Sequence, residues 1–255
     1  MKPPLLFIHG AFTRAGRWRP WIERFEAAGY RCLAPSLPAH DPPDREALSR
    51  LTFANYVDAM VAEYESLGEP AIVIGSSMGG LIAQHVAVRT NPRGLVLISS
   101  AAPWRGGSRA ETLPYAALYF VPVLLGLPLT GSKRAARKLV LHDLTRAEQD
   151  ELLAIFADES GKAYRTMVLG GPPLAKGAVR CPVFCISGGG DRLFKPTVGE
   201  SIAAFYDAEH LVFPEAGHTL ASGDLAKTIT SEIMGWIEGL AAPRPPASLA
   251  AGAVV

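Results

Sequence analysis

The sequence has few cysteines and no excess of charge of one sign. Its cysteines, Cys32, Cys181 and Cys185, are too few and too irregularly placed for a disulfide scaffold or a zinc site. This usage favours a reducing, cytoplasmic location. Lys plus Arg number 25 against 24 Asp plus Glu, a net charge of +1, whereas a nucleic-acid-binding protein usually carries a basic excess. We therefore expect no nucleic-acid partner.

A long uninterrupted hydrophobic run is also absent. The apolar run at residues 5–8 is too short for the core of a signal peptide. Residues 112–129 are almost wholly apolar, but Pro114, Pro122, Gly126 and Pro128 interrupt them. A spanning helix tolerates an occasional proline, not this density in so short a segment. We therefore expect no targeting segment and no stable insertion into a membrane.

The chain does contain strand-like and helix-like segments in alternation. Short apolar or β-branched runs predict strands at residues 5–8, 31–34, 71–74, 95–98, 183–187 and 210–213. Apolar residues at helical spacing predict helices at residues 18–29, 53–68, 78–89, 197–206 and 225–240. This alternation predicts an α/β fold, with a mostly parallel, doubly wound sheet that has helices on both faces.

The alternation stops between residues 103 and 177. This stretch has no clear strand, and it contains the interrupted apolar run, a basic helix at 133–141 and a helix at about 145–156. We interpret residues 103–177 as a helical cap or lid, inserted between the core segments 1–102 and 178–240. Residues 241–255, in which prolines stand among alanines, are expected to form a weakly structured tail.

The sequence Gly75-Ser76-Ser77-Met78-Gly79 lies between a predicted strand and a predicted helix. It matches the motif G-x-S-x-G, which indicates a nucleophilic serine when it stands between a strand and a helix, as it does here. A strand that turns at once into a helix strains the central residue, and small neighbours let the chain pass closely. The side chain of Ser77 then projects at a helix N-terminus, whose dipole favours a developing negative charge. Ser77 is therefore the candidate nucleophile.

A serine nucleophile needs a base, and the base needs a group that orients it. His218 follows the last predicted strand, at the sheet edge where active sites of parallel sheets assemble. The other five histidines fit structural roles better. Asp191 follows three glycines after the strand 183–187, at the same edge. The alternative position for the acid, after the strand 95–98, holds no carboxylate.

Together these residues resemble the α/β-hydrolase superfamily, in which nucleophile, acid and histidine follow each other along the chain in this order. Three more segments support the resemblance: His9-Gly10-Ala11-Phe12, Leu37-Pro38-Ala39-His40-Asp41, and Pro182-Val183 with Gly188. The match extends to about residue 240 outside the 103–177 segment. It departs from the pattern at Ser76, where many relatives have histidine, and at Ala39, where many have glycine.

The resemblance implies an α/β-hydrolase fold and a Ser77–His218–Asp191 triad that works through an acyl-enzyme. The backbone N–H groups of Met78 and of either Ala11 or Phe12 would form the oxyanion hole. No metal and no organic cofactor is implied. A serine nucleophile points to esters, thioesters, lactones or carbon–carbon bonds next to a ketone, whereas epoxide hydrolases and haloalkane dehalogenases use an aspartate.

We therefore predict a hydrolase for a small-to-medium apolar ester or thioester. The candidate substrate-binding residues are Phe12, Ser76, Leu113, Tyr119, Phe120 and Leu124. Two other classes stay open. A lyase or cyclase would use the triad for proton transfer, with Lys176 or Lys195 as its pocket lysine, and a receptor would hold a ligand without turning it over. The oligomeric state is not predicted.

Overall fold

The sheet at the centre of the molecule is parallel throughout. The structure is a computed structural model that describes residues 1–104, 113–169, 171–194, 196–220 and 223–241. Within these residues six strands form one sheet in the order β2-β1-β3-β4-β5-β6. The strands are β1 (Leu5–Ile8), β2 (Cys32–Leu33), β3 (Ile72–Ser76), β4 (Gly94–Ile98), β5 (Val183–Gly188) and β6 (Glu209–Phe213). The expected parallel sheet is confirmed.

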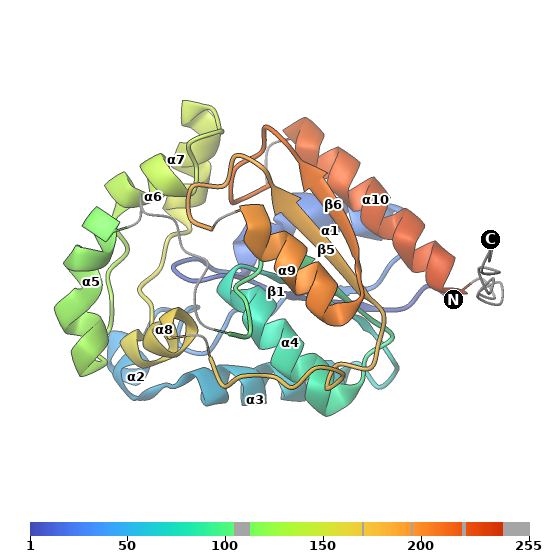
Figure 1. The fold of residues 1–255 in the computed structure, drawn as a ribbon, viewed down its shortest axis with the longest axis horizontal. Helices are drawn as coiled ribbons and strands as arrows, with labels where there is room; N and C mark the ends of the chain where they lie inside the picture. The colour runs from blue at the N-terminus through green and yellow to red at the C-terminus, as the bar shows by residue number, and fades with distance from the viewer. Residues whose placement is uncertain (105–112, 170, 195, 221–222, 242–255) are drawn as a thin grey trace, which may run out of the picture.

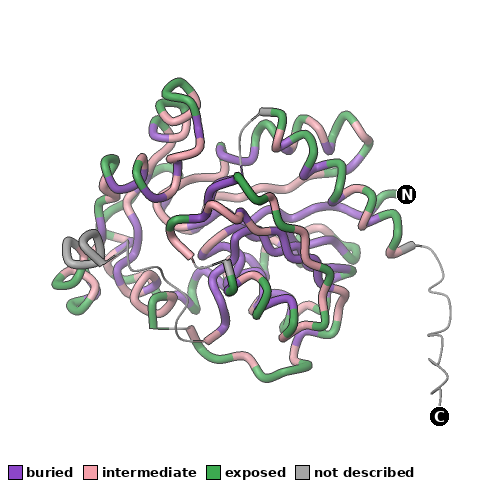
Figure 2. Tube along the Cα trace, turned by 45° about the horizontal axis from the view of Figure 1, so that its top comes forward, coloured by how far each residue is buried: buried purple, intermediate pink, exposed green. Residues whose placement is uncertain are grey.

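Helices cover both faces of this sheet (Figure 1). They are α1 (Arg19–Ala27), α3 (Phe53–Ser66), α4 (Met78–Thr90), α9 (Pro196–Tyr206) and α10 (Gly223–Ala241). Successive side chains of a strand point to opposite faces, so β1 contributes to two separate cores. Leu6 and Ile8 pack with α3, α4 and α9, while Leu5 and Phe7 pack with α1 and α10. The inner strands β1, β3 and β4 are consequently buried on both sides (Figure 2), whereas the edge strands β2 and β6 are partly exposed.

Some helix boundaries differ from those expected. The segment 18–29 begins as a 3₁₀ turn, η1 (Ala15–Trp18), and continues as α1. Two short helices, α2 (Arg45–Arg50) and α8 (Gly161–Val168), were not predicted. Each starts with a side chain that accepts a hydrogen bond from the first turn: Asp44 accepts from the N–H of Ala47, and Ser160 from that of Ala163. Such caps satisfy N–H groups that a helix start leaves without partners.

Between β4 and β5 the chain forms a group of helices at one end of the molecule, on the left in Figure 1. In residues 103–177, here named the insertion, the described elements are α5 (Leu113–Leu125), α6 (Lys133–Leu139), α7 (Arg146–Ala154) and α8. The side chains of Thr145 and Glu148 form a capping box at the start of α7. In the described part of the chain, no helix is long and apolar enough to cross a bilayer. The tail predicted at 241–255 lies outside the described residues after Ala241.

Candidate active site

Ser77 occupies the turn between β3 and α4. Its φ of 56° and ψ of −122° place it in a region that residues with a side chain rarely adopt. The turn is held by its own backbone: the N–H of Ser77 donates to the Ile98 carbonyl at 3.1 Å, and its carbonyl accepts from the N–H of Ala101 at 3.0 Å. Met78 is the first residue of α4, so its N–H has no partner within the helix. The strained turn thus places Ser77 at the N-terminus of α4, beside a backbone N–H group that the helix itself does not satisfy.

The two glycines of the motif are needed for close approach of the chain. A Cβ atom on Gly75 would collide with the carbonyl of Gly79, and one on Gly79 would collide with the carbonyls of Ile8 and His9. Because these contacts are with backbone atoms, no side-chain rotation can relieve them. The turn therefore packs directly against the end of β1, and larger residues at these two positions would push Ser77 out of place.

Asp191 and His218 form a buried pair. Asp191 follows β5, His218 follows β6, and the Nδ1 atom of His218 lies 2.8 Å from Oδ2 of Asp191. Both side chains are 5% exposed. Since a carboxylate only accepts hydrogen bonds, the proton is on Nδ1 and Nε2 is left as the acceptor. The ring of Phe194 packs edge-on against the imidazole, with centroids 5.3 Å apart, and fixes its plane further.

The surroundings of Asp191 favour its ionised form. Burial by itself raises the pKa of this carboxyl group, but the charge and hydrogen bond of His218 oppose burial and lower the pKa below its ordinary value. The backbone N–H groups of Leu193 and Phe194 act in the same direction, because they donate to Oδ1 at 2.7 and 3.1 Å. Asp191 therefore stays a carboxylate near neutral pH and keeps the His218 tautomer fixed.

The insertion supports the loops that carry these two residues. Oδ2 of Asp143 accepts a hydrogen bond at 2.7 Å from the N–H of Gly217, the residue before His218. The hydroxyl of Thr219, the residue after it, donates to the Val140 carbonyl. Nε2 of His142 lies 3.0 Å from the carbonyl of Gly190, next to Asp191. Three neighbouring residues of the insertion thus brace both the acid loop and the histidine loop.

The insertion also holds the loop after β1. Phe12 has a φ of 60°, and both of its backbone groups are bound by the segment that precedes α8. Its N–H donates to Oε2 of Glu159 at 3.4 Å, and its carbonyl accepts from the N–H of Ala157 at 3.0 Å. Sequence reasoning left the second oxyanion donor open between Ala11 and Phe12. Because the N–H of Phe12 already has a partner, the geometry favours Ala11.

Glu159 itself is part of a fully buried ionic cluster that the sequence analysis missed. Its carboxylate accepts hydrogen bonds from the Tyr56 hydroxyl and from the Ser160 N–H, both at 2.7 Å. Nε2 of His40 lies 3.3 Å from Oε2 of Glu159, and its Nδ1 lies 3.1 Å from the Pro38 carbonyl. Both ring nitrogens of His40 face acceptors, which is the pattern of an imidazolium. Burial lowers the pKa of His40, but Glu159 and the backbone carbonyls outweigh burial and raise it.

Replacing Glu159 by alanine is expected to lower the free energy of unfolding by about 3–5 kcal/mol, because the change leaves the buried His40 cation without its counter-ion. Urea unfolding followed by circular dichroism measures this loss. The exposed Glu23, whose ion pair with Arg19 lies on the surface of α1, provides the control, and Glu23→Ala should cost at most about 1 kcal/mol. Equal losses in the two variants would mean that the cluster is not an ion pair.

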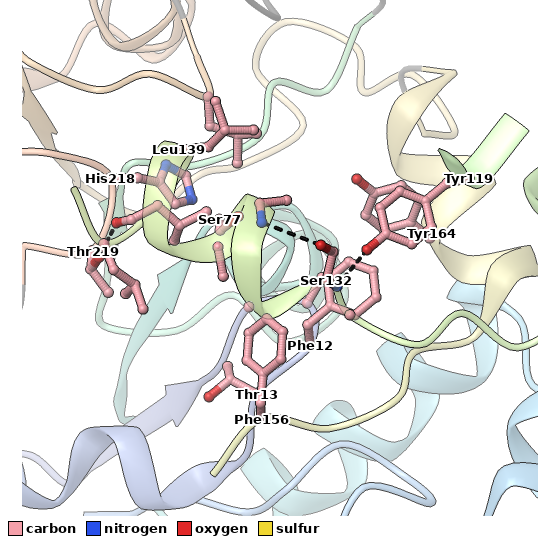
Figure 3. Close-up of a pocket in the computed structure, with 18 of the residues that line it drawn as sticks. Phe12, Thr13, Ser77, Tyr119, Ser132, Leu139, Phe156, Tyr164, His218 and Thr219 are labelled. Carbon is pink, nitrogen blue, oxygen red and sulfur yellow. Dashed lines mark hydrogen bonds between the residues drawn. The ribbon is translucent and has the colours of Figure 1, made fainter. Parts of the chain in front are cut away.

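A cavity of about 430 Å³ opens beside Ser77 and His218, and its lining is mainly apolar. Figure 3 shows the two side chains together on one side, with the rings of Tyr119 and Tyr164 on the other. The ring of Phe12 packs against those of Tyr119, Phe156 and Tyr164, with centroids 5.8, 6.1 and 5.3 Å apart. The core loops and the insertion therefore enclose the cavity between them.

Most of the predicted substrate-binding residues meet at this cavity. Phe12, Ser76, Tyr119 and Phe120 line it. Leu124 lies on α5, but this residue is 58% exposed and is not part of the described lining. The side chain of Leu113 lies outside the described residues. The lining also includes Arg17, Leu139 and Met167, which the sequence analysis did not select.

The remaining histidines and the candidate lysines lie elsewhere. His9 is buried and accepts a hydrogen bond on Nε2 from the N–H of Leu37, so its Nδ1 donates to the Gly10 carbonyl. Burial lowers the pKa of His9 to about 3 and keeps it neutral.

Neither His210 nor Lys176 lines the cavity. His210 contacts the hydroxyl of Ser187. Lys176 is exposed and is not part of the described lining, and Lys195 lies outside the described residues.

Comparisons with known proteins agree with this architecture. The model of the alpha/beta hydrolase family matches residues 5–225. The magnesium-chelatase 30 kDa subunit of Rhodobacter capsulatus is 28% identical over 93% of this chain and 87% of its own length. The phospholipase YtpA of Bacillus subtilis is 33% identical, over 37% of this chain and 39% of its own length.

Solved structures share the fold at low sequence identity. A methylesterase from Arabidopsis superposes with a TM-score of 0.74 at 14% identity, over 93% of this chain and 99% of that one. A monoacylglycerol lipase from Paleococcus ferrophilus gives a TM-score of 0.71 at 18% identity, over 94% and 97% of the two chains. At these identities the likeness shows the fold alone. The match of the family model over most of the chain shows that this protein belongs to the alpha/beta hydrolase family.

Proposed function

We propose that this protein is a serine hydrolase that cleaves an ester or thioester of a small-to-medium apolar substrate through an acyl-enzyme. The observation that carries the proposal is the buried His218–Asp191 pair, 2.8 Å apart, at the cavity that Ser77 also lines. A histidine with an ionised partner on Nδ1 is a base on Nε2, and a serine on a strained turn needs such a base. The similarity to the phospholipase YtpA of Bacillus subtilis supports the same class of reaction.

In the proposed first step, Oγ of Ser77 attacks the carbonyl carbon of the substrate while Nε2 of His218 takes its proton. The carbonyl oxygen becomes an oxyanion, and the N–H groups of Met78 and Ala11 bind it. Each such donor contributes about 2.7–4 kcal/mol in the transition state. The oxyanion then collapses, the bond from the acyl carbon to the leaving oxygen or sulfur breaks, and the imidazolium protonates the departing alcohol or thiol. The acyl group stays on Oγ of Ser77. Asp191 stabilises the imidazolium and holds its orientation without taking the proton.

In the second step, water replaces the leaving group in the site. Nε2 of His218 accepts a proton from this water as its oxygen attacks the acyl carbon. The second oxyanion collapses, the bond to Oγ of Ser77 breaks, and the serine regains its proton from His218. The products are a carboxylic acid and the free enzyme.

The substrate class follows from the cavity and from the lid role that we propose for the insertion. A volume of about 430 Å³ is in the range of small-molecule sites, which are lined mostly by apolar side chains. The aromatic side of the cavity, built by Phe12, Tyr119, Phe156 and Tyr164, suits an apolar acyl or alcohol group. A short or medium aliphatic chain fits this volume better than a bulky polymer does.

A series of p-nitrophenyl esters, from acetate to dodecanoate, with thioesters of the same acids, tests the proposal. We expect kcat/KM to pass through a maximum at a medium chain, and we expect Ser77→Ala to reduce turnover to background. Ser231→Ala, which removes an exposed hydroxyl on α10, is the control and should match the native protein. Turnover in Ser77→Ala as fast as in the native protein would refute the proposal. Tight binding of these esters without turnover would instead favour the alternative that this protein is a receptor, which holds its ligand without hydrolysing it.

A further inference from the structure

Arg17 is a buried cation at the wall of the cavity. Arg17 lies on η1 and is only 8% exposed. It lines the cavity together with His218 and Thr219. Burial lowers its pKa to about 10, so the guanidinium remains protonated near neutral pH. A cation of this kind next to the proposed catalytic residues calls for a partner, because burying an unpaired charge is strongly unfavourable.

The protein supplies only part of the surroundings that this charge requires. Nη2 of Arg17 donates to the Thr219 carbonyl at 3.2 Å. One face of the guanidinium lies over Trp18, with Cζ 4.5 Å from the ring centroid. Among the described residues, no carboxylate forms an ion pair with Arg17, and its side chain donates no second hydrogen bond. The remaining N–H donors of the guanidinium thus have no acceptor from the described part of the protein.

The geometry points to a carboxylate of the substrate as the missing partner: we propose that Arg17 is the anion-binding residue of the cavity. The fork of a guanidinium matches the two oxygens of a carboxylate. Arg17 is the one cationic side chain in the described lining, apart from the titratable His218, so its charge balances a single negative charge. A doubly charged phosphate monoester would exceed what this site can neutralise.

This inference rests on the proposed function and narrows its substrate class. Because Arg17 binds the residue after His218, the carboxylate would lie on the His218 side of the cavity. Figure 3 shows Thr219 and His218 on the side away from Tyr119 and Tyr164. The substrate that fits both sides is an ester with a free carboxylate at one end and an apolar group at the other.

Two matched pairs of esters test this prediction on either side of the scissile bond. Mono-p-nitrophenyl suberate against p-nitrophenyl octanoate places the carboxylate on the acyl side. 4-(Carboxymethyl)phenyl butyrate against its primary amide analogue places it on the alcohol side. For the native protein we expect kcat/KM to favour the carboxylate member in at least one pair. In Arg17→Gln this preference should fall by about 10- to 100-fold, the effect of one charge-assisted hydrogen bond.

The ratio of kcat/KM between the two esters of a pair shows whether Arg17 recognises the carboxylate or only supports the loop that carries His218. If Arg17 only holds Thr219, Arg17→Gln lowers both members equally and leaves the ratio unchanged, which would overturn the proposal. Arg17→Lys keeps the charge and should retain part of the preference, and it replaces the glutamine variant if that one does not fold. Arg19→Gln removes the same charge from an exposed position on α1 and should leave the ratio as it is. A native protein that prefers neither carboxylate member would also overturn it.

Binding to the Ser77→Ala variant distinguishes a failure of this inference from a failure of the proposed function. In calorimetry, Ser77→Ala should bind the preferred carboxylate ester more tightly than the neutral one, and Ser77→Ala combined with Arg17→Gln should bind both alike. This readout does not depend on turnover. Discrimination without turnover in the native protein would therefore uphold the anion site while refuting the hydrolase, whereas turnover without discrimination would do the reverse.

Discussion

Replacing His218 by alanine is expected to lower kcat by about 10⁶-fold, because the loss of the base in such a triad removes nearly all of its effect. If the proposal holds, removing His218 leaves no other histidine or carboxylate in the described cavity lining to accept the proton of Ser77 or to protonate the leaving group. The remaining activity comes from binding and from the oxyanion donors. Steady-state kinetics with the best p-nitrophenyl ester measure this loss, and added imidazole should restore part of the rate in the vacated space.

The matched control is His210→Gln. This histidine contacts Ser187 on β5, is not part of the described cavity lining, and its loss should leave kcat close to the native value. Far-ultraviolet circular dichroism shows whether both variants fold. If folded His218→Ala kept kcat within tenfold of the native protein, another group would be the base and the assignment of His218 would be wrong.

Replacing Asp191 by asparagine is expected to lower kcat by about 10⁴-fold while the fold is kept. The amide oxygen can still accept from the N–H groups of Leu193 and Phe194, so the turn after β5 has its anchors. The amide nitrogen then faces Nδ1 of His218 as a donor and forces the ring proton onto Nε2. A ring in this tautomer cannot take the proton of Ser77. Kinetics and thermal unfolding of the same preparation give both quantities.

Asp207→Asn is the control for this prediction. Asp207 is nearer to His218 in the sequence, but it is exposed at the end of α9, before β6. Its replacement should leave kcat unchanged. A result in which Asp191→Asn retains activity and Asp207→Asn loses it would move the acid of the triad to the opposite edge of the sheet.

The sheet and the main helices could be predicted because their signals are local. The β-branched run before Gly75 predicts a buried strand, and the spacing of Phe53, Tyr56 and Met60 predicts a helix face. All of these side chains are buried in the structure. The short helices α2 and α8 were missed because they bury few apolar side chains: Leu48 in α2 and Ala163 in α8. Asp44 and Ser160, which cap them, are signals that sequence reasoning can use.

The parts of the site that depend on distant contacts could not be predicted. His40 and Glu159 are 119 positions apart, and no local pattern marks either as half of an ion pair. Arg17 stands among other arginines near the start of the chain, and only the fold brings it to the carbonyl of Thr219, 202 positions away. Ser77, Asp191 and His218 could be selected as candidates from the sequence, because each follows a predicted strand at the same edge of the sheet. Parallel topology converts that local signal into proximity.

The most direct test of an activated Ser77 is its labelling by a fluorophosphonate, followed by intact-mass spectrometry of the native protein and of Ser77→Ala. The reagent reacts with a serine only when a base activates it. We expect one adduct on the native protein, none on Ser77→Ala, and the same single adduct on the control Ser231→Ala. An unlabelled native protein, or an adduct that persists in Ser77→Ala, would contradict the assignment of Ser77 as an activated nucleophile.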